Sequence, residues 1–288
     1  MIRFAPLLAV AATPAIAAPE VAVDIAPVHS LVSRVMEGAG APRLVLPQGA
    51  SAHGHAMAPS EARVLAEADL LIWVGPALTP WLGGAAEALA PGIRMVTLLD
   101  AAEDDHGGHG DHDHGHAHGD DDPHVWLDPI EAAGMMERVA DALAEADPAN
   151  ADLYRANASR GRADMEALVA RIDGTLGAPR FVASHDAYGH FEKRFGVEAM
   201  AALADGEDAP PGAGRVRMAR GMMEGAACVF VENASESADL AEVLGGEVGA
   251  RLVEVDPLGS AYEVGPGLYP ALIEGVAEAM RGCGADGA

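Results

Sequence analysis

Long hydrophobic runs, basic residues and aromatic residues are all scarce in this chain of 288 residues. Beyond the N-terminus no segment offers the roughly 18 uninterrupted apolar residues that a membrane-spanning helix needs. Lys and Arg number 18 against 44 Asp and Glu, a balance that argues against binding to nucleic acid. Aromatic residues make up 4% of the chain, so Ala, Val and Leu must fill most of the core.

Cysteine is also rare, with Cys228 and Cys283 as the two in the chain, and a CxxC motif typical of a metal or redox site is absent. In an oxidising compartment, two thiols of one small protein usually pair. We therefore expect a disulfide that ties the C-terminal segment to the predicted strand around Cys228.

The N-terminus reads MIRFAPLLAVAATPAIAAPE. One Arg, a short apolar run and the small-x-small sequence Ala15-Ile16-Ala17 are typical of a secretory signal peptide, which we place at residues 1–17. A membrane anchor is the alternative, but the apolar run is too short to span a bilayer. Loss of Arg3 with the signal leaves 17 basic and 44 acidic residues, a net charge of −27. The sequence thus predicts an exported, soluble and acidic protein.

Apolar runs alternate with helical segments in both halves of the chain. Strands are predicted at 21–27, 43–49, 70–75, 93–99 and 180–184, and later within CVFVENA and RLVEVDPLG. This alternation argues for parallel βαβ units. Between the halves lie a helix at 129–147 and a second one from Pro148 to about Gly177, roughly 40 Å long. We predict an α/β fold of two Rossmann-like lobes, each a parallel sheet flanked by helices, joined by one long helix.

The predicted domain boundaries follow from this pattern. An N-terminal lobe should occupy 18–128, a helical segment 129–178 and a C-terminal lobe 179–288. Inside the first lobe, residues 103–122 are of low complexity and contain no apolar residue except Ala. We expect this tract to be a solvated, disordered loop.

Histidine is concentrated in the same tract. It holds six of the twelve histidines of the chain, namely His106, His109, His112, His114, His116 and His118. Because they alternate with Gly, Asp and Ala, nothing determines their mutual geometry, and a metal ion must order the loop in order to bind. We predict auxiliary weak metal sites that raise the local metal concentration.

Four other potential metal ligands lie outside the histidine-rich part of the tract. His53 and His185 each follow a predicted strand, Asp256 ends one, and His124 comes directly after the tract. The loops after parallel strands converge on a cleft where ligands bind. Three imidazoles and one carboxylate form a set suited to Zn²⁺. A single histidine is more often a hydrogen-bonded loop residue, so placement alone leaves the two interpretations balanced.

Segments along the whole mature chain resemble one known family. They are PVHSLV, LPQGASAHGHAMAPSEARVLAEADLLIWVGPALTPWL, the acidic His tract, HVWLDP, FVASHDAYGHFEKRFG, CVFVEN and VDPLG. In this order they are similar to the zinc receptors of bacterial ABC importers, the ZnuA-like solute-binding proteins with a rigid helical spine. The resemblance implies two α/β lobes joined by one rigid helix, with zinc bound in the cleft and handed to a membrane permease.

The resemblance also implies a ligand set. His53, His124 and His185 match ligand positions, and the last favours zinc because manganese-binding relatives typically have Glu there. Some zinc receptors have an acid immediately before the first His, but this chain has Ala52. The fourth ligand is then Asp256 or a water, and we favour Asp256. The cysteine pair matches a disulfide of the zinc branch.

The segments that carry the resemblance also contain Glu232, His29, His55 and His190. Glu232, at a predicted strand end, either holds an imidazole proton behind the site or is a surface acid. His29 and His190 match no ligand position and are expected to be packed or capping residues. His55 could be an exposed accessory ligand.

The predicted function is high-affinity capture of zinc in the periplasm and its delivery to the permease of an ABC importer. We expect a monomeric binding protein and not an enzyme, with an auxiliary periplasmic chaperone as a further partner of the tract. A zinc chaperone or buffer that serves other proteins is an alternative that the sequence does not separate from the receptor. A zinc hydrolase is a third interpretation, since three protein ligands plus water is also a catalytic arrangement, but HExxH is missing.

Overall fold

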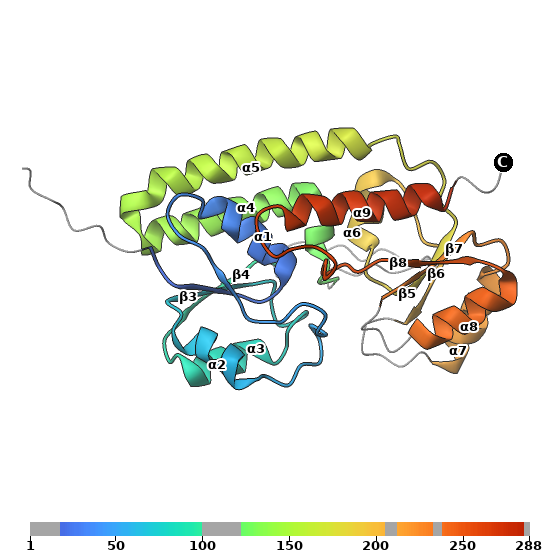
Figure 1. The fold of residues 1–288 in the computed structure, drawn as a ribbon, viewed down its shortest axis with the longest axis horizontal. Coiled ribbons are helices and arrows are strands. Elements are labelled where there is room, and N and C mark those ends of the chain that lie inside the picture. The colour runs from blue at the N-terminus through green and yellow to red at the C-terminus, as the bar shows by residue number, and fades with distance from the viewer. Residues whose placement is uncertain (1–17, 100–121, 205–211, 233–237, 285–288) are drawn as a thin grey trace, which may run out of the picture.

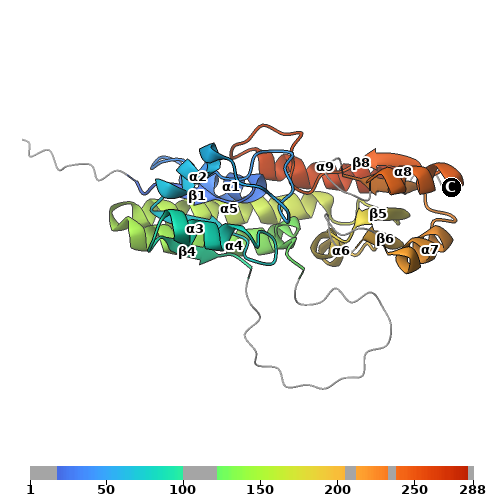
Figure 2. The same ribbon diagram turned by 90° about the horizontal axis from the view of Figure 1, so that it is seen from below.

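Two four-stranded parallel sheets lie at opposite ends of the molecule in a computed structural model that describes residues 18–99, 122–204, 212–232 and 238–284 (Figure 1). The first sheet has the order β2-β1-β3-β4, with β1 at Val21–Val23, β2 at Arg43–Leu44, β3 at Leu70–Trp73 and β4 at Arg94–Thr97. The second has the order β6-β5-β7-β8, with β5 at Phe181–His185, β6 at Ala201–Ala204, β7 at Cys228–Val231 and β8 at Arg251–Glu254. The perpendicular view shows the same two groups separated along the long axis (Figure 2).

Each sheet has its own helices, and three further helices run along the molecule. The first sheet is accompanied by α1 (Ala26–Val35), α2 (Pro59–Ala66) and α3 (Leu82–Leu89). The second is accompanied by α6 (Gly189–Phe195), α7 (Ala213–Met222) and α8 (Ala238–Val248). The long helices are α4 (Pro129–Ala146), α5 (Ala151–Ile172) and α9 (Leu268–Gly282), and the short 3-10 turns are η1 (Val125–Leu127) and η2 (Pro148–Asn150). The predicted α/β fold with two parallel sheets and a long helix is confirmed.

The central strands are buried on both faces because helices cover them, which explains their continuous apolar sequences. They are shorter than predicted. The strand expected at 21–27 ends at Val23, because α1 begins at Ala26 and Pro27 lies in its first turn, where proline is favoured. His185, expected just after a strand, is instead the last residue of β5.

The helices α2 and α3 both depend on contacts beyond their own helical propensity. Helix α2 begins at Pro59, and the Glu61 carboxylate accepts the backbone N–H of Ala58 at 2.8 Å. The helix α3 is not predicted from its sequence LGGAAEAL, which contains two glycines of low helix propensity. It forms because Leu82 and Ala86 are buried in one apolar cluster with Trp73. Gly83, which has no side chain, lets the helix approach the Trp73 ring closely.

The pair α4 and α5 forms the helical spine. Asp128 caps α4, since its carboxylate accepts the N–H of Ile130 at 2.8 Å and Pro129 follows at the first helical position. Helix α5 has 22 residues, about 33 Å at 1.5 Å per residue, and is shorter than predicted. The prediction was too long because Pro148–Asn150 forms a separate 3-10 turn and the helix ends before Gly174, which has a φ of 68°.

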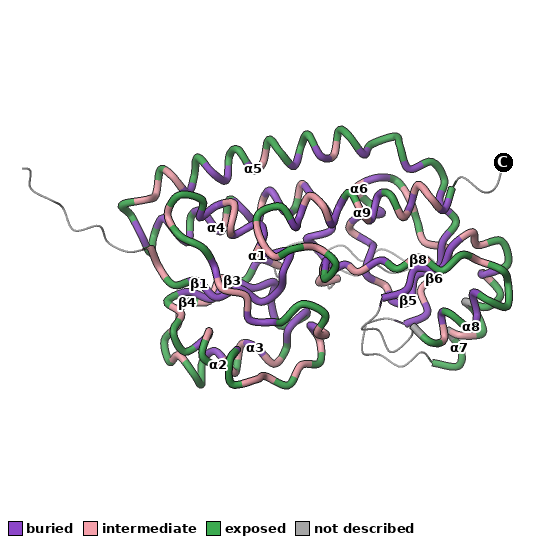
Figure 3. The backbone as a smooth tube through the Cα atoms, viewed as in Figure 1, coloured by how far each residue is buried: buried purple, intermediate pink, exposed green. Residues whose placement is uncertain are grey.

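One apolar core cluster connects both sheets. It includes side chains of both sheets together with buried residues of α4, α5 and α9, such as Val23, Met136, Leu168, Phe181 and Val276. Figure 3 shows these buried stretches running from one sheet along the helices to the other. The sheets are therefore coupled by apolar packing as well as by covalent connections.

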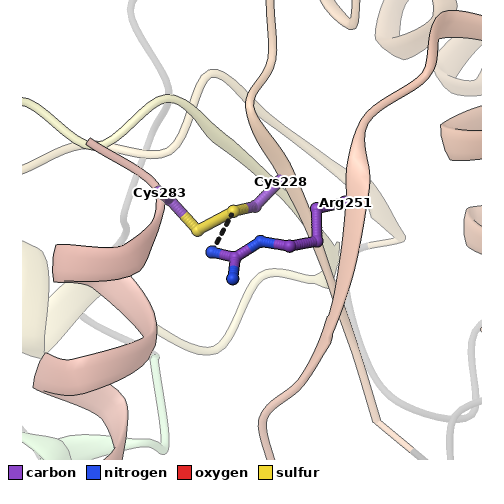
Figure 4. The surroundings of a disulfide bond; sticks show 3 residues. All are labelled: Cys228, Arg251 and Cys283. Carbon is purple, nitrogen blue, oxygen red and sulfur yellow. Dashed lines mark hydrogen bonds between the residues drawn. A yellow bond between two sulfur atoms is a disulfide. The ribbon is translucent and has the colours of Figure 1, made fainter. Parts of the chain in front are cut away.

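The disulfide predicted from the sequence is confirmed. Cys228, the first residue of β7, is bonded to Cys283, which follows α9, with a Cα–Cα distance of 5.6 Å (Figure 4). A guanidinium nitrogen of Arg251 lies 3.5 Å from the sulfur of Cys228. The bond attaches the C-terminal end of α9 to the second sheet.

Within the described ranges, no helix has the length and apolar character of a membrane span.

Asp24 is a fully buried carboxylate that connects two strand ends of the first sheet. One oxygen accepts the N–H of Ile25 and the other accepts the N–H of Val74, both at 2.8 Å. Burial raises the pKa of Asp24 from 3.8 to about 7, although these backbone hydrogen bonds act in the opposite direction. Between these two values the folded protein holds a proton that the unfolded chain has lost. Asp24 therefore lowers the free energy of unfolding as pH rises from about 4 to about 7.

The variant Asp24→Asn isolates this effect, because an amide does not titrate. We expect the difference in unfolding free energy between the two proteins to change by up to about 4 kcal/mol between pH 4 and pH 7, in the direction that disfavours the carboxylate. Urea unfolding of both metal-free proteins across this range measures it, and the histidines cancel in the difference. A difference that stays constant with pH would show that Asp24 ionises normally.

Candidate metal centre

A cavity of about 100 Å³ lies between the two sheets and collects the residues that the sequence singled out. Its described lining includes His53, His124, His185, Glu232 and Asp256. These come from segments on both sides of the molecule, and the described lining contains no Lys or Arg. The cavity is therefore bordered by imidazoles and carboxylates, the side chains that bind divalent transition metals.

His53 lies on the segment 45–58, which leaves the first sheet after β2. The segment continues the hydrogen bonding of β1, since Val45 donates its N–H to the carbonyl oxygen of Val23 at 2.8 Å. Further along, the indole N–H of Trp81 donates to the carbonyl oxygen of Ala52 at 2.9 Å. Ala52 itself is buried and lines the cavity, so the residue before His53 contributes a methyl group to it.

His124 immediately precedes η1 and is 4% exposed. The Asp122 carboxylate lies 2.8 Å from its Nδ1 and also accepts its backbone N–H at 3.0 Å. Burial alone would raise the pKa of Asp122, but the hydrogen bonds with His124 and the charges of His124 and His190 outweigh it and lower this pKa. The ring of His124 is therefore oriented through Nδ1, and Nε2 is directed at the cavity.

His185 ends β5 and is 1% exposed. Its Nδ1 lies 3.0 Å from Oε1 of Glu232, which follows β7 directly. The Tyr188 hydroxyl lies within hydrogen-bond distance of Glu232 at 3.3 Å and of the Val255 carbonyl oxygen at 3.2 Å. Burial and the charge of Glu232 raise the pKa of Tyr188, so the phenol is protonated and can donate. Glu232 is buried, and the alternative that it is a surface acid is wrong.

The three imidazoles lie next to one another around the cavity. Nε2 of His185 is 3.4 Å from Nε2 of His124, and their ring centres are 5.2 Å apart. The ring of His53 is farther away, 6.1 Å from that of His124. In the part of the chain that the structure describes, no three His, Cys, Asp or Glu side chains already have the spacing of a formed metal site. Two rings are thus in close contact and the third borders the same space.

Asp256 follows β8 and borders the cavity from the side of the second sheet. Its two carboxylate oxygens accept the backbone N–H groups of Leu258 and Ser260, each at 2.7 Å. Each oxygen retains a further lone pair. The carboxylate therefore stabilises the turn after β8 and can still bind a cation.

The other described histidines, His29, His55 and His190, do not line the cavity. His29 is half-buried and bonds the Pro42 carbonyl oxygen at 3.1 Å, as expected for a packed residue, and burial lowers its pKa despite this hydrogen bond. His190 contacts the carbonyl oxygen of Asp122 at 3.2 Å. His55 is not an exposed ligand, since it is 15% exposed and lies 2.7 Å from the Glu61 carboxylate. The six histidines from His106 to His118 lie outside the described residues.

Asp122 is the residue of the site that the sequence analysis missed. A signal was present, because Asp122 and Pro123 immediately precede His124. Proline disfavours the helical conformation in the residue before it, and Asp122 lies outside the helices and strands. Asp122 was missed because similar acidic residues precede it in the tract and do not distinguish it from them.

Comparison with known proteins decides the family. The model of the ZnuA family, described as zinc-uptake complex component A, periplasmic, matches residues 21–283. The chain belongs to the ZnuA family. The high-affinity zinc uptake system protein ZnuA of Paracoccus denitrificans is 37% identical, over 97% of this chain and 96% of that protein. ZnuA of Brucella abortus is 32% identical, over 91% of each chain.

Solved structures agree on the fold of this ZnuA family member. A crystal structure of a ZnuA deletion mutant with zinc bound superposes with a TM-score of 0.78 at 20% identity, over 94% of this chain and all of that one. At this identity the likeness supports the two-sheet architecture and the long helix alone.

Proposed function

We propose that His53, His124 and His185 hold the zinc ion that this ZnuA family member takes up, in the cavity between its sheets. Members of the family are periplasmic components of zinc-uptake complexes, so the chain is a solute-binding transport component and not an enzyme. The observation that carries the assignment is the close approach of two buried imidazoles, each with a carboxylate behind it.

The distances between the rings support tetrahedral zinc. With Zn–N bonds of about 2.05 Å, two ligand nitrogens lie roughly 3.3 Å apart and their ring centres about 5 Å apart. The corresponding distances between His124 and His185 are 3.4 Å and 5.2 Å. Zinc can bind to both Nε2 atoms with little movement of either ring. The 6.1 Å between the rings of His53 and His124 implies that His53 moves inward by about 1 Å when it binds.

Carboxylates behind two of the rings support the same assignment. A zinc-bound histidine usually donates its other ring N–H to an acceptor, which determines the tautomer and the direction of the ring. Asp122 occupies this position for His124, and Glu232 occupies it for His185. Both are positioning residues, because they act on the metal through an imidazole.

Asp256 is the proposed fourth ligand. It borders the cavity and is held in place by two backbone N–H groups, so little conformational freedom is lost when it binds. A water molecule in this position is the alternative. Glu232 also borders the cavity, but it contacts His185 and Tyr188 and is better suited to orienting the ring.

The size of the cavity favours a metal ion over an organic substrate. Pockets for organic ligands usually measure about 300–1,000 Å³, whereas this one measures about 100 Å³. A hydrolase needs space for its substrate beside the metal, so this interpretation is disfavoured. A buffer or chaperone that serves other proteins would use the same cavity, and the family membership favours the importer.

The finer assignments concern export and partners. We propose that residues 1–17 are a cleaved signal peptide, that the chain acts as a monomer, and that it delivers zinc directly to a permease. The six histidines from His106 to His118 would bind further zinc weakly and supply His124, with an auxiliary periplasmic chaperone as an additional partner. The short distance along the chain from His118 to His124 supports this transfer.

The ligand assignment is tested by His185→Ala in a protein that lacks residues 104–121. Removal of the tract should lower the zinc stoichiometry measured by calorimetry but leave one tight site of nearly unchanged affinity. The further change His185→Ala should abolish that site, because zinc loses an imidazole held on the framework. His29→Gln, outside the cavity, is the matched control and should bind normally. One tightly bound zinc remaining in the His185→Ala protein would contradict the assignment.

The orienting carboxylates are tested by Glu232→Gln and Asp122→Asn. Each change preserves the shape of the side chain but removes the charged acceptor behind a ligand imidazole. We expect each to reduce zinc affinity on the order of 10- to 100-fold in a chelator competition. Glu137→Gln, an exposed change on α4, should leave the affinity unchanged. Equal zinc affinities in the wild type and all three variants would show that neither carboxylate orients a zinc ligand.

The fourth ligand is tested by Asp256→Ala and Asp256→Asn. Alanine should weaken zinc binding and accelerate its dissociation without abolishing binding, because a water can occupy the vacant tetrahedral position. Asparagine retains one neutral oxygen, which can accept one of the two turn N–H groups and still offer a lone pair to the metal, so its effect should be smaller than that of alanine. Asp152→Ala on the surface of α5 is the control. Dissociation as slow as in the wild type would indicate that water, or another group, already fills this position.

A further inference from the structure

One exposed hydrogen-bonded bridge connects the two walls of the cavity. The side-chain amide of Gln48 donates to the carbonyl oxygen of Tyr262 at 2.8 Å and lies 3.4 Å from that of Gly259. Gln48 belongs to the segment that carries His53, whereas Gly259 and Tyr262 belong to the turn that follows Asp256. A single side chain therefore links the segments that contribute two of the proposed ligands.

The bridge lies at the rim of the cavity. Gly49 and Ala50 line it on one wall, and Leu258 and Ser260 line it on the other. Gln48 is their neighbour, but it is exposed and is absent from the lining. A change at Gln48 can therefore alter the connection between the walls without altering the groups that face the metal.

A second polar connection to this turn lies deeper. The indole N–H of Trp126 donates to the carbonyl oxygen of Pro257 at 2.9 Å, and Trp126 is fully buried. The backbone carbonyl oxygen of Trp126 accepts the hydroxyl of the buried Tyr269 at 2.6 Å. Water competes for the exposed amide of Gln48 but does not reach these buried groups. The bridge at the rim is consequently the connection that opens most easily.

The turn from Asp256 to Tyr262 is stabilised by hydrogen bonds of its own. The Asp256 carboxylate binds the N–H groups of Leu258 and Ser260, and the N–H of Tyr262 donates to the Gly259 carbonyl oxygen at 3.0 Å. A second cavity of about 270 Å³, lined by Asp256, Ser260 and Tyr262 together with residues of α9, lies along the same turn. Space is therefore available into which the outer part of the turn can withdraw.

We propose that Gln48 is a latch whose hydrogen bonds to the turn at 256–262 control the rates at which zinc enters and leaves the cavity. The proposal rests on the proposed function, in which this cavity holds the transported zinc. Opening the latch lets the outer part of the turn withdraw while Trp126 keeps its base in place. Because the latch touches no proposed metal ligand, it slows association and dissociation alike and has little influence on the equilibrium affinity. Gln48 is thus a positioning residue.

The partners of Gln48 are both carbonyl oxygens, so the latch needs a hydrogen-bond donor at position 48. Gln48→Met has a similar length and no donor, and Gln48→Arg is a matched control that retains donors. Stopped-flow mixing of the full mature protein with less than one equivalent of zinc gives the association rate, and transfer to a chelator gives the dissociation rate. With Met we expect both rates to rise about 2- to 10-fold, the factor for one lost hydrogen bond, with a dissociation constant within about twofold of the wild type. Arg should restore rates close to those of the wild type.

Hydrogen exchange of the amides at 258, 260 and 262 provides a readout that does not depend on zinc. Gln48→Met should accelerate their exchange in the metal-free protein, and Gln48→Arg should not. Unchanged exchange, or faster exchange with unchanged zinc rates, would overturn the latch. Failure of the proposed function has a different signature: tight zinc binding would survive His185→Ala, whatever the exchange at the turn.

Discussion

The arrangement of the cavity depends on the hydrogen bonds of the buried residue Trp126. Its indole N–H donates to the Pro257 carbonyl oxygen, and its backbone carbonyl oxygen accepts the Tyr269 hydroxyl. Tyr269 in turn donates its backbone N–H to the Ser30 hydroxyl of α1 at 3.0 Å. One residue thus connects His124, two positions earlier, with the turn that carries Asp256 and with the helices beside the first sheet. Loss of these contacts would remove the buried polar connection between the segment of His124 and the turn that carries Asp256.

The carboxylates around the site have divided tasks. Asp122 and Glu232 contact ring nitrogens, and Asp256 orders its own turn while facing the cavity. Negative charge close to buried imidazoles is costly without a cation, since burial disfavours the charged form of an acid. Hydrogen bonds with His124 offset this cost at Asp122 and lower its pKa. A divalent cation bound between the rings, as proposed, would offset it further.

The continuous core limits how the protein can open. Side chains of both sheets pack against the same helices, and the disulfide attaches α9 to the second sheet. A wide separation of the sheets would expose this core to water at a large cost in free energy. A local change at the rim, where exposed Gln48 and the turn at 256–262 meet, would open the cavity at a smaller cost in free energy.

The sequence by itself determined the features that depend on local patterns. Apolar runs between turn residues identified the parallel strands, the helical pattern at 129–147 predicted α4, and two cysteines in an exported chain predicted their bond. Strand ends and family resemblance together singled out His53, His124, His185 and Asp256, which the fold places around one cavity. The lengths of β1 and α5 were overestimated. The apolar pattern of β1 continues to Pro27, although α1 has already begun there, and the helical pattern of α5 includes Pro148–Asn150, which form a separate turn.

Tertiary structure alone decided which partners these side chains have. Glu232 could have been a surface acid, and Asp122 was one of several similar acids, until the docking of the two sheets placed each beside an imidazole. Likewise, nothing near Gln48 in the sequence indicates carbonyl acceptors more than 200 positions away. Local patterns act over one turn or one strand, whereas these contacts depend on how α4, α5 and α9 hold the sheets together. That packing arises from the whole core, and no short segment of the sequence encodes it.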